Sequence, residues 1–215
     1  MWLQYEHAPL SHWLNGMLLF TEPTLPYVTE LPDWSAGRDP ITLSRQLLWP
    51  EGYTAHLDRT LLLARLPILL TGLFLGAALA RWAKMGAGWL SQSAVMVLFA
   101  FSPNLLASFA LATTDAPLTA VYLGAVFALW SYWQSPSWER WLLAAAMLGL
   151  AISAKITALL LLPVTLLLCY SRWQRGQPWW RPGLVWLSLL PVAGLVLWTL
   201  YGFEWRSMAG LPFTV

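Results

Sequence analysis

The sequence predicts an all-α protein, a polytopic bundle of about six transmembrane helices, two of them short, with short interfacial helices beside it. Three observations lead to this prediction. Of the 215 residues, 58% are hydrophobic and only 10% are charged, and the mean hydropathy is +0.57, which lies outside the range of soluble globular chains. The apolar residues gather in blocks of near membrane-spanning length. The 16 tryptophans, many of them at block ends, suit an interfacial aromatic belt.

Six apolar blocks define the predicted bundle: residues 61–80, 89–110, 117–133, 141–153, 156–170 and 184–203. Four of them can cross a bilayer core of about 30 Å, because a helix needs roughly 20 residues to do so. The stretch 141–170 allows two interpretations, one long tilted helix or two short helices that meet near Ser153 and Lys155. We expect two short helices. A lysine at the centre of a lipid-facing helix costs at least a few kcal/mol, whereas a lysine at a bend can reach water or a carboxylate.

Basic residues in the short connections predict the orientation in the cell membrane, because such residues stay on the cytoplasmic side. They are Arg81, Lys84, Arg140, Arg172, Arg175 and Arg181. Residues 1–60 are then an extracytoplasmic loop with short amphipathic helices over 9–20 and 39–49. Residues 61–203 form the transmembrane bundle, and 204–215 begin another outer loop. Nine of the ten acidic residues fall on the outer side, which makes it the favoured side for chemistry.

Charge and cysteine content exclude several classes of site. The net charge is +2, and the lysines and arginines are scattered along the chain, so no basic stripe for nucleic acid is present. The single cysteine, Cys169, excludes a disulfide within the chain and a cysteine-based metal site. It lies in an apolar run, where it is most simply a small buried hydrophobe.

Acidic groups on the predicted outer side are the first candidates for chemistry. Glu6 and His7 precede a short helix; a carboxylate there can hold a divalent cation, and an imidazole can bind metal or phosphate. The same pattern is also an ordinary polar loop before a helix that starts with proline. Asp115, in the TTDAP run at 113–117, is either a base or metal ligand at the membrane boundary or a helix cap.

Cationic groups are the second set of candidates. Lys155 is either a snorkelling side chain or a group that binds an anion or compensates a charge inside the bundle. Arg59 and Arg65 flank the outer start of the first span, where a guanidinium can grip a phosphate bidentately or anchor the helix. Arg65 lies deeper in the apolar block and is the better phosphate candidate.

The order of several segments resembles a known family. EHAPL, a Trp/Pro-rich insert, ARLPILLTGLFLG, FSPNLLASFALATTDAPLTA and GLAISAKITALLLLPVTLLL follow one another in the chain. This order is similar to that of phospholipid carrier-dependent glycosyltransferases of the GT-C superfamily, the protein O-mannosyltransferases and aminoarabinose transferases. The likeness covers residues 5–170 and rests on order, spacing and topology rather than on one motif.

The resemblance implies an inverting membrane enzyme. It would transfer a sugar from a polyprenyl-phosphate donor to an acceptor hydroxyl of a protein, lipid or glycan at the extracytoplasmic face. Matched to the family's motifs, Asp115 and Glu6 are the catalytic candidates, and His7 and Lys155 are candidates for binding substrate or phosphate. Arg65 is a further candidate for binding phosphate, on its position in the first span alone. Glu6 is also the candidate ligand for a divalent metal ion. One departure is mild: this chain has EHAPL where the family usually has EHPPL.

A larger departure concerns the two ends of the chain. The family begins with a transmembrane helix and an acidic pair in the first outer loop, and it continues with further spans after the last block seen here. We therefore expect an internal fragment, inactive on its own, of a longer transferase. Two alternatives from other classes stay open. A transporter would use Lys155 and Asp115 as charges along a path with further ionisable groups at mid-membrane depth, and a non-catalytic membrane scaffold would need neither residue.

Overall fold

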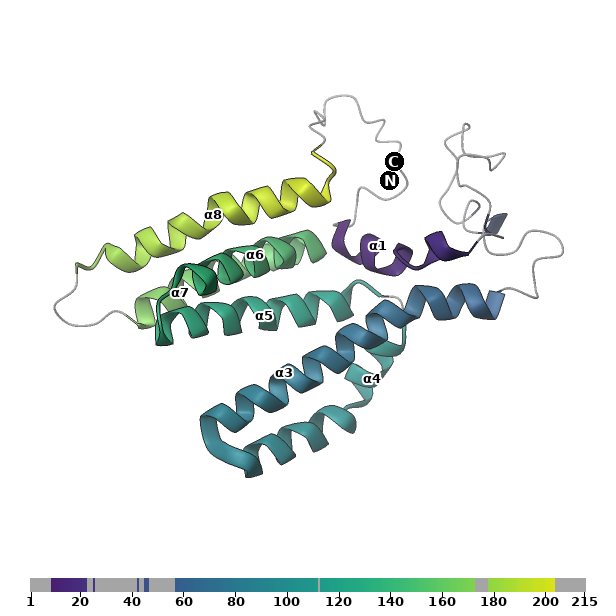
Figure 1. Ribbon diagram of the computed structural model, residues 1–215, viewed down its shortest axis with the longest axis horizontal. Coiled ribbons are helices and arrows are strands. Elements are labelled where there is room, and N and C mark those ends of the chain that lie inside the picture. Colours follow the sequence, from purple (N-terminus) through teal and green to yellow (C-terminus); the bar gives the residue numbers. More distant parts are fainter. Residues whose placement is uncertain are drawn as a thin grey trace. The chain divides into compact units, whose positions relative to one another are not determined.

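A computed structural model of the chain describes residues 9–22, 25, 42, 45–46, 57–111, 113–172 and 178–203. Helices, turns and short connections make up this part of the chain, and it contains no strand, so the predicted all-α class is confirmed (Figure 1). Three helices are long and apolar enough to span a membrane: α3 (Leu57–Ala100), α5 (Asp115–Gln134) and α8 (Arg181–Leu200). Two compact units divide the chain. One is Met1–Val121 with Ala154–Ile156, and the other is Tyr122–Ser153 with Thr157–Val215.

The first unit begins with two short helices that pack on the start of α3. They are α1 (Pro9–Gly16) and η1 (Leu19–Thr21), and both contact α3. Pro9, Leu10 and Ser11 are the buried residues of α1. The helix predicted over 9–20 is therefore confirmed as two short pieces. The second amphipathic helix, predicted over 39–49, lies outside the described residues except for Thr42, Arg45 and Gln46, which are helical.

A hairpin within α3 follows. Its backbone leaves the helical conformation at Ala87 and Gly88, where Gly88 has φ 82°, a value that glycine adopts without steric cost. Figure 1 shows the two arms, residues 57–86 and 89–100, folded back on each other. The hairpin accounts for the predicted blocks 61–80 and 89–110, but the second block is not one continuous helix. It breaks at Ser102, and α4 (Pro103–Ala110) begins with Pro103, because proline disfavours helical geometry in the residue before it.

Two glycines of the first arm let the hairpin close. A Cβ on Gly72 would lie 2.6 Å from Cγ of Phe109 on α4, and a Cβ on Gly76 would lie 2.9 Å from the Phe99 ring. The rings of Phe99 and Phe109 are 6.3 Å apart between centroids, within the range of favourable aromatic pairs. The returning arm and α4 thus pack on a glycine face of α3.

The second unit contains most of α5, with α6 (Trp138–Ala154), η4 (Ile156–Leu160), α7 (Leu161–Ser171) and α8. A Cβ on Gly149 of α6 would lie 2.6 Å from the carbonyl oxygen of Ala193 on α8. Polar side chains add cross-links: the Trp141 indole donates to Ser188 Oγ at 2.9 Å, and the Trp186 indole donates to Thr165 Oγ1 at 3.0 Å. Small residues and side-chain hydrogen bonds of this kind are typical of helix packing in membranes. Cys169 is free and buried, as expected.

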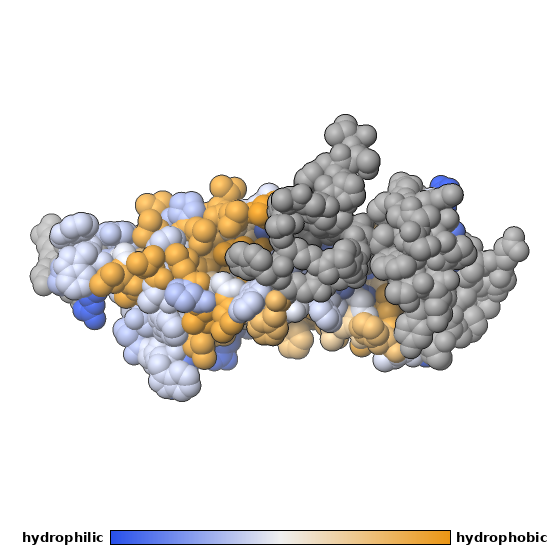
Figure 2. Space-filling view, turned by 90° about the horizontal axis from the view of Figure 1, so that it is seen from above, coloured by the Kyte–Doolittle hydropathy of each residue, from blue (hydrophilic) through white to orange (hydrophobic). Residues whose placement is uncertain are grey.

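Large apolar side chains cover the outer faces of the spanning helices. Leu73 and Phe74 of α3 are 70% and 75% exposed, and Leu184 of α8 is 54% exposed. Figure 2 shows hydrophobic residues along α8, with paler residues near its first turn. Outward-facing apolar surface of this extent fits contact with lipid, which supports the predicted membrane bundle.

Candidate functional site

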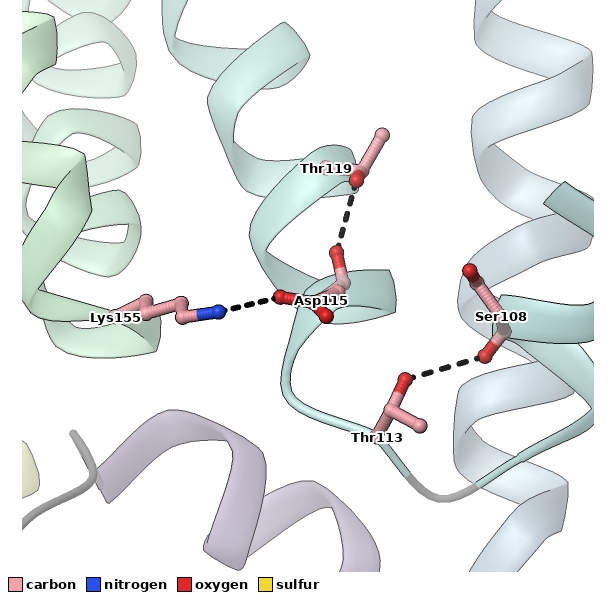
Figure 3. Close-up of polar contacts among 5 residues, drawn as sticks. All are labelled: Ser108, Thr113, Asp115, Thr119 and Lys155. Carbon is pink, nitrogen blue, oxygen red and sulfur yellow. Dashed lines mark hydrogen bonds and ion pairs between the residues drawn. The ribbon is translucent and has the colours of Figure 1, made fainter. Parts of the chain in front are cut away.

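Asp115 is the first residue of α5. The Thr114 carbonyl accepts the first helical hydrogen bond from the Leu118 amide at 3.4 Å, so Thr114 rather than Asp115 occupies the cap position. The Thr113 hydroxyl donates to the Ser108 carbonyl of α4 at 3.4 Å. The Thr119 hydroxyl donates to the backbone carbonyl of Asp115 at 2.8 Å (Figure 3). Threonines on both sides therefore fix the backbone around Asp115, while its carboxylate stays available for another partner.

Lys155 lies in the break between two helices. Helix α6 ends at Ala154, Lys155 itself is not helical, and η4 begins at Ile156. The expectation of two short helices that meet near Ser153 and Lys155 is therefore confirmed, and the alternative of one long helix over 141–170 is excluded. Ser153 is fully buried, and its hydroxyl donates to the Leu150 carbonyl at 2.8 Å. Because of this break, the Lys155 side chain does not project from the face of a continuous helix.

An ion pair joins these two residues. Lys155 Nζ lies 2.7 Å from Asp115 Oδ1, and both residues belong to the first unit (Figure 3). The Asp115 side chain is 63% exposed and the Lys155 side chain 33%, so the pair can be reached from outside. Lys155 compensates the charge of Asp115 in this structure. Forty residues separate the pair in the chain, and it places an accessible carboxylate and an accessible ammonium side by side.

Of the other predicted site residues, the structure describes only Arg65. Arg65 lies half-buried on the first arm of α3, and within the described ranges it makes no ion pair. Glu6 and His7 lie outside the described residues, so their roles, and the divalent metal ion expected at Glu6, stay predictions. In the described part of the chain, no group of three or more His, Cys, Asp or Glu residues could hold a metal ion.

A second ion pair was not predicted. Glu22, which directly follows η1, places Oε2 2.8 Å from Nε of Arg59 in the first turn of α3. From the sequence, Arg59 was interpreted either as a phosphate ligand or as an anchor of the helix. In the structure it forms an ion pair with a residue of the protein itself. The Glu22 side chain is only 2% exposed. Nothing in the sequence marks Glu22 as buried, because it stands at the start of a polar, proline-rich stretch.

Comparison with known families decides the class of protein. Residues 54–201 match the model of the dolichyl-phosphate-mannose-protein mannosyltransferase family. The chain belongs to this family. The match includes Arg65, Asp115 and Lys155 but begins after Glu6 and His7, so the likeness drawn from the EHAPL segment is not covered by it. No curated protein and no solved structure matches the chain.

Membership in the mannosyltransferase family supports glycosyl transfer in a membrane as the general chemistry, with a polyprenyl-phosphate sugar donor and a protein acceptor in general. The transporter alternative required further ionisable groups at mid-membrane depth. After its first residue, α5 carries no Asp, Glu, Lys or Arg, and neither do α7 and the part of α8 after Arg181. The sequence of these helices therefore favours the transferase over a charged path.

Proposed function

We propose that this chain is part of an enzyme that transfers a sugar from a polyprenyl-phosphate donor to an acceptor hydroxyl, with inversion at the anomeric carbon. The acceptor oxygen forms a bond to that carbon as the bond from the carbon to the phosphate oxygen breaks. The hydroxyl proton passes to a carboxylate, and the bonding electron pair leaves with the polyprenyl phosphate. The family match and the Asp115–Lys155 ion pair support this proposal.

Lys155 is the proposed partner of the departing phosphate. An ammonium has three N–H donors, and the ion pair occupies one of them at 2.7 Å. The others can bond phosphate oxygens, whose negative charge grows as the sugar leaves. A cation already held at this position stabilises the transition state more than the ground state. Arg65 and His7 are the further proposed phosphate or substrate ligands.

Asp115 and Glu6 are the proposed catalytic carboxylates. A general base must come within about 2.6–3.2 Å of the atom that it deprotonates, and the exposure of Asp115 leaves room for an acceptor. Glu6 is also the proposed ligand of a divalent metal ion, which would bind the donor phosphate. A protein is the acceptor that the family favours, and a lipid or a glycan hydroxyl would demand the same chemistry.

The extracytoplasmic face of the cell membrane is the proposed side of reaction. The connection 111–114 and the break at Lys155 lie at helix ends opposite to those that carry Arg81, Lys84, Arg140 and Arg172 along the chain. Because basic connections stay in the cytoplasm, the ion pair would face the other side. Nine of the ten acidic residues share that predicted side.

The test is transfer of a labelled sugar from polyprenyl-phosphate donors in membranes that contain the full-length gene product. Asp115→Asn and Lys155→Met should each lower the transfer rate by about 10²-fold or more, the usual effect of losing a catalytic carboxylate or a charge-stabilising donor. Glu139→Gln and Lys84→Met are matched controls, because both side chains are exposed and lie on connections predicted for the cytoplasmic side. They should leave transfer unchanged.

Membrane-inserted protein must be quantified for every variant, so that loss of protein is not taken for loss of activity. Unchanged transfer in both Asp115→Asn and Lys155→Met would refute the site. Absence of transfer from every donor by the unaltered protein would refute the function and favour a scaffold or transporter.

A further inference from the structure

Every charged side chain that the structure describes in the second unit lies at one end of that unit. These residues are Glu139 and Arg140 in the first turn of α6, Arg172 directly after α7, and Arg181 at the start of α8. Helix α5 ends there as well, at Gln134 (Figure 1). Three arginines against one carboxylate make this arginine end positive, while the rest of the described unit carries no charged side chain.

Two of these arginines are fixed by the last turns of α5. Nη1 of Arg140 donates to two backbone carbonyl oxygens at the C-terminal end of α5, at 3.1 and 3.2 Å. In the amide orientation that satisfies its neighbours, the Gln134 side-chain oxygen accepts from Arg172 Nη2 and from the Trp130 indole, each at 3.1 Å. Each guanidinium is therefore held through one of its nitrogens.

Most donors of the two guanidiniums remain available for another partner. A guanidinium has five N–H donors in a planar fork that matches two phosphate oxygens, and in the described part of the chain the protein uses one nitrogen of each. The neighbouring Glu139 carboxylate accepts hydrogen bonds from Ser137 and from its own backbone amide, and it feels the charge of Arg140 without an ion pair among the described residues. Arg172 is exposed and Arg140 half-buried, so an anion can reach both.

Apolar surface adjoins the arginine end on the side toward the middle of the helices. Leu143 and Leu184 each lie three residues beyond an arginine of this end, along α6 and α8, and are 45% and 54% exposed. Trp138 and Trp179 are both 70% exposed, and tryptophan favours the headgroup level of a bilayer. A ligand with a charged head and apolar chains matches this surface better than a soluble anion does.

We propose that the arginine end binds the phosphodiester headgroup of an anionic phospholipid, with Arg140 and Arg172 as its ligands. A headgroup without an amine keeps its full negative charge, so it complements this end better than a zwitterionic headgroup does. Basic pockets between membrane helices bind anionic headgroups in this way. The lipid comes from the leaflet that the basic connections predict to be cytoplasmic. Binding does not rest on the proposed function.

Lipid binding is measured on the purified full-length gene product in detergent, by native mass spectrometry at increasing concentrations of phosphatidylglycerol or phosphatidylcholine. Each basic residue near an anionic headgroup contributes about fivefold in affinity. The Kd for phosphatidylglycerol should therefore be lower than that for phosphatidylcholine by about tenfold or more. Arg140→Gln/Arg172→Gln should remove most of this preference, and binding of both lipids with equal Kd by the unaltered protein would overturn the site.

Arg81→Gln/Lys84→Gln is the matched control, because it removes two exposed positive charges from the turn of α3 on the same predicted side. It should leave the preference for phosphatidylglycerol unchanged. An equal loss in this control would overturn the site, since attraction would then depend on overall charge alone.

Gln134→Ala tests the anchoring of Arg172 without a change in charge. The Arg172 side chain must then be ordered by the lipid itself, which should raise the Kd for phosphatidylglycerol by about two- to tenfold. An unchanged Kd would overturn Arg172 as an anchored ligand. Arg172→Gln alone should raise the Kd by about fivefold; both residues are exposed, so these two variants decide the matter if the double arginine variant does not accumulate.

Glycerol phosphate carries the phosphate without acyl chains and so separates a lipid ligand from a soluble anion. In detergent with phosphatidylcholine, added phosphatidylglycerol should raise the midpoint temperature of thermal unfolding, because a ligand of the folded state stabilises it. Glycerol phosphate at the same concentration should not. Equal stabilisation by both would overturn the lipid ligand. None of these measurements requires sugar transfer, so failure of the proposed function is distinguishable from failure of this site.

Discussion

Asp115 and Lys155 meet at 2.7 Å although forty residues and two helices separate them in the chain. The carboxylate comes from the first turn of an apolar helix, and the ammonium comes from a one-residue break between two others. Neither group is deeply buried, so the pair contributes about 1 kcal/mol or less to stability, as partly exposed pairs do. The pair therefore matters more for the proposed chemistry than for the stability of the fold.

Charge reversal separates stability from chemistry at this pair. Asp115→Lys alone and Lys155→Asp alone should each reduce the thermal stability of the purified protein, because each brings like charges together. The double variant restores an ion pair and should recover part of that stability, because a lysine at position 115 is unfavourable at the positive N-terminal end of α5. Sugar transfer should stay lost because position 115 no longer carries a carboxylate. Thermal unfolding in detergent and the transfer assay check the two parts. Recovery of transfer in the double variant would contradict a direct role for Asp115.

The glycine face of α3 gives a prediction about packing. Gly72→Ala places a Cβ 2.6 Å from the Phe109 ring, and overpacking of this kind costs about 1–3 kcal/mol. Gly86→Ala is the matched control, since a Cβ there meets nothing within 4 Å and alanine favours a helix over glycine. The midpoint temperature of thermal unfolding should fall for Gly72→Ala and should stay the same or rise for Gly86→Ala. Phe109→Leu should partly rescue Gly72→Ala; equal effects of both glycine substitutions would contradict this packing.

The turn of the α3 hairpin gives a second backbone prediction. Gly88 has φ 82° and ψ −168°, a region that is essentially open to glycine alone, so that another residue there pays about 1–3 kcal/mol. Gly88→Ala should therefore destabilise the protein although space around Gly88 is open. Gly88→Asn should be no better, because asparagine gains only in the left-handed helical region. Thermal unfolding compares both variants with Gly86→Ala, and a neutral Gly88→Ala would show that the turn has another conformation.

The hydrogen bond between α8 and α7 can be measured as a coupling energy. The Trp186 indole donates to Thr165 Oγ1 at 3.0 Å, and such bonds in membrane proteins contribute about 0.6 kcal/mol on average and at most about 1.7. Trp186→Phe and Thr165→Val should each destabilise, and the double variant should cost less than their sum. Trp179→Phe is the control, because Trp179 is 70% exposed. Additive losses would mean that no bond forms in the membrane.

The helices could largely be predicted from the sequence, because the apolar blocks and the prolines report local structure directly. The break at Lys155 followed from the cost of a charge within an apolar run, and it is confirmed. The interruption before Pro103 was missed because the apolar composition continues across it, although proline itself was a signal. The reversal at Gly88 fell between two predicted blocks, so only its backbone conformation was unforeseen.

The candidate site was predicted residue by residue but not as an arrangement. Asp115 and Lys155 were each singled out, yet hydropathy and spacing carry no information on which residues forty positions apart will touch. The Glu22–Arg59 pair was missed for a related reason. Burial of Glu22 depends on how α1 and η1 pack on α3, which is a tertiary property that no local pattern encodes. Glu6 and His7 lie outside the described residues, so their prediction stays untested.

The break that ends α6 at Ala154 has an electrostatic consequence for the ion pair. A helix carries a partial negative charge at its C-terminal end and a partial positive charge at its N-terminal end, and each favours an opposite charge nearby by about 0.3–1 kcal/mol. Lys155 directly follows the C-terminal end of α6, and Asp115 is the first residue of α5. The start of η4 at Ile156 places an opposite partial charge on the other side of Lys155, so the two helix ends offset each other there, whereas Asp115 keeps part of its stabilisation when the pair opens. In the proposed reaction, an incoming phosphate can therefore draw the ammonium away without leaving the Asp115 carboxylate wholly uncompensated.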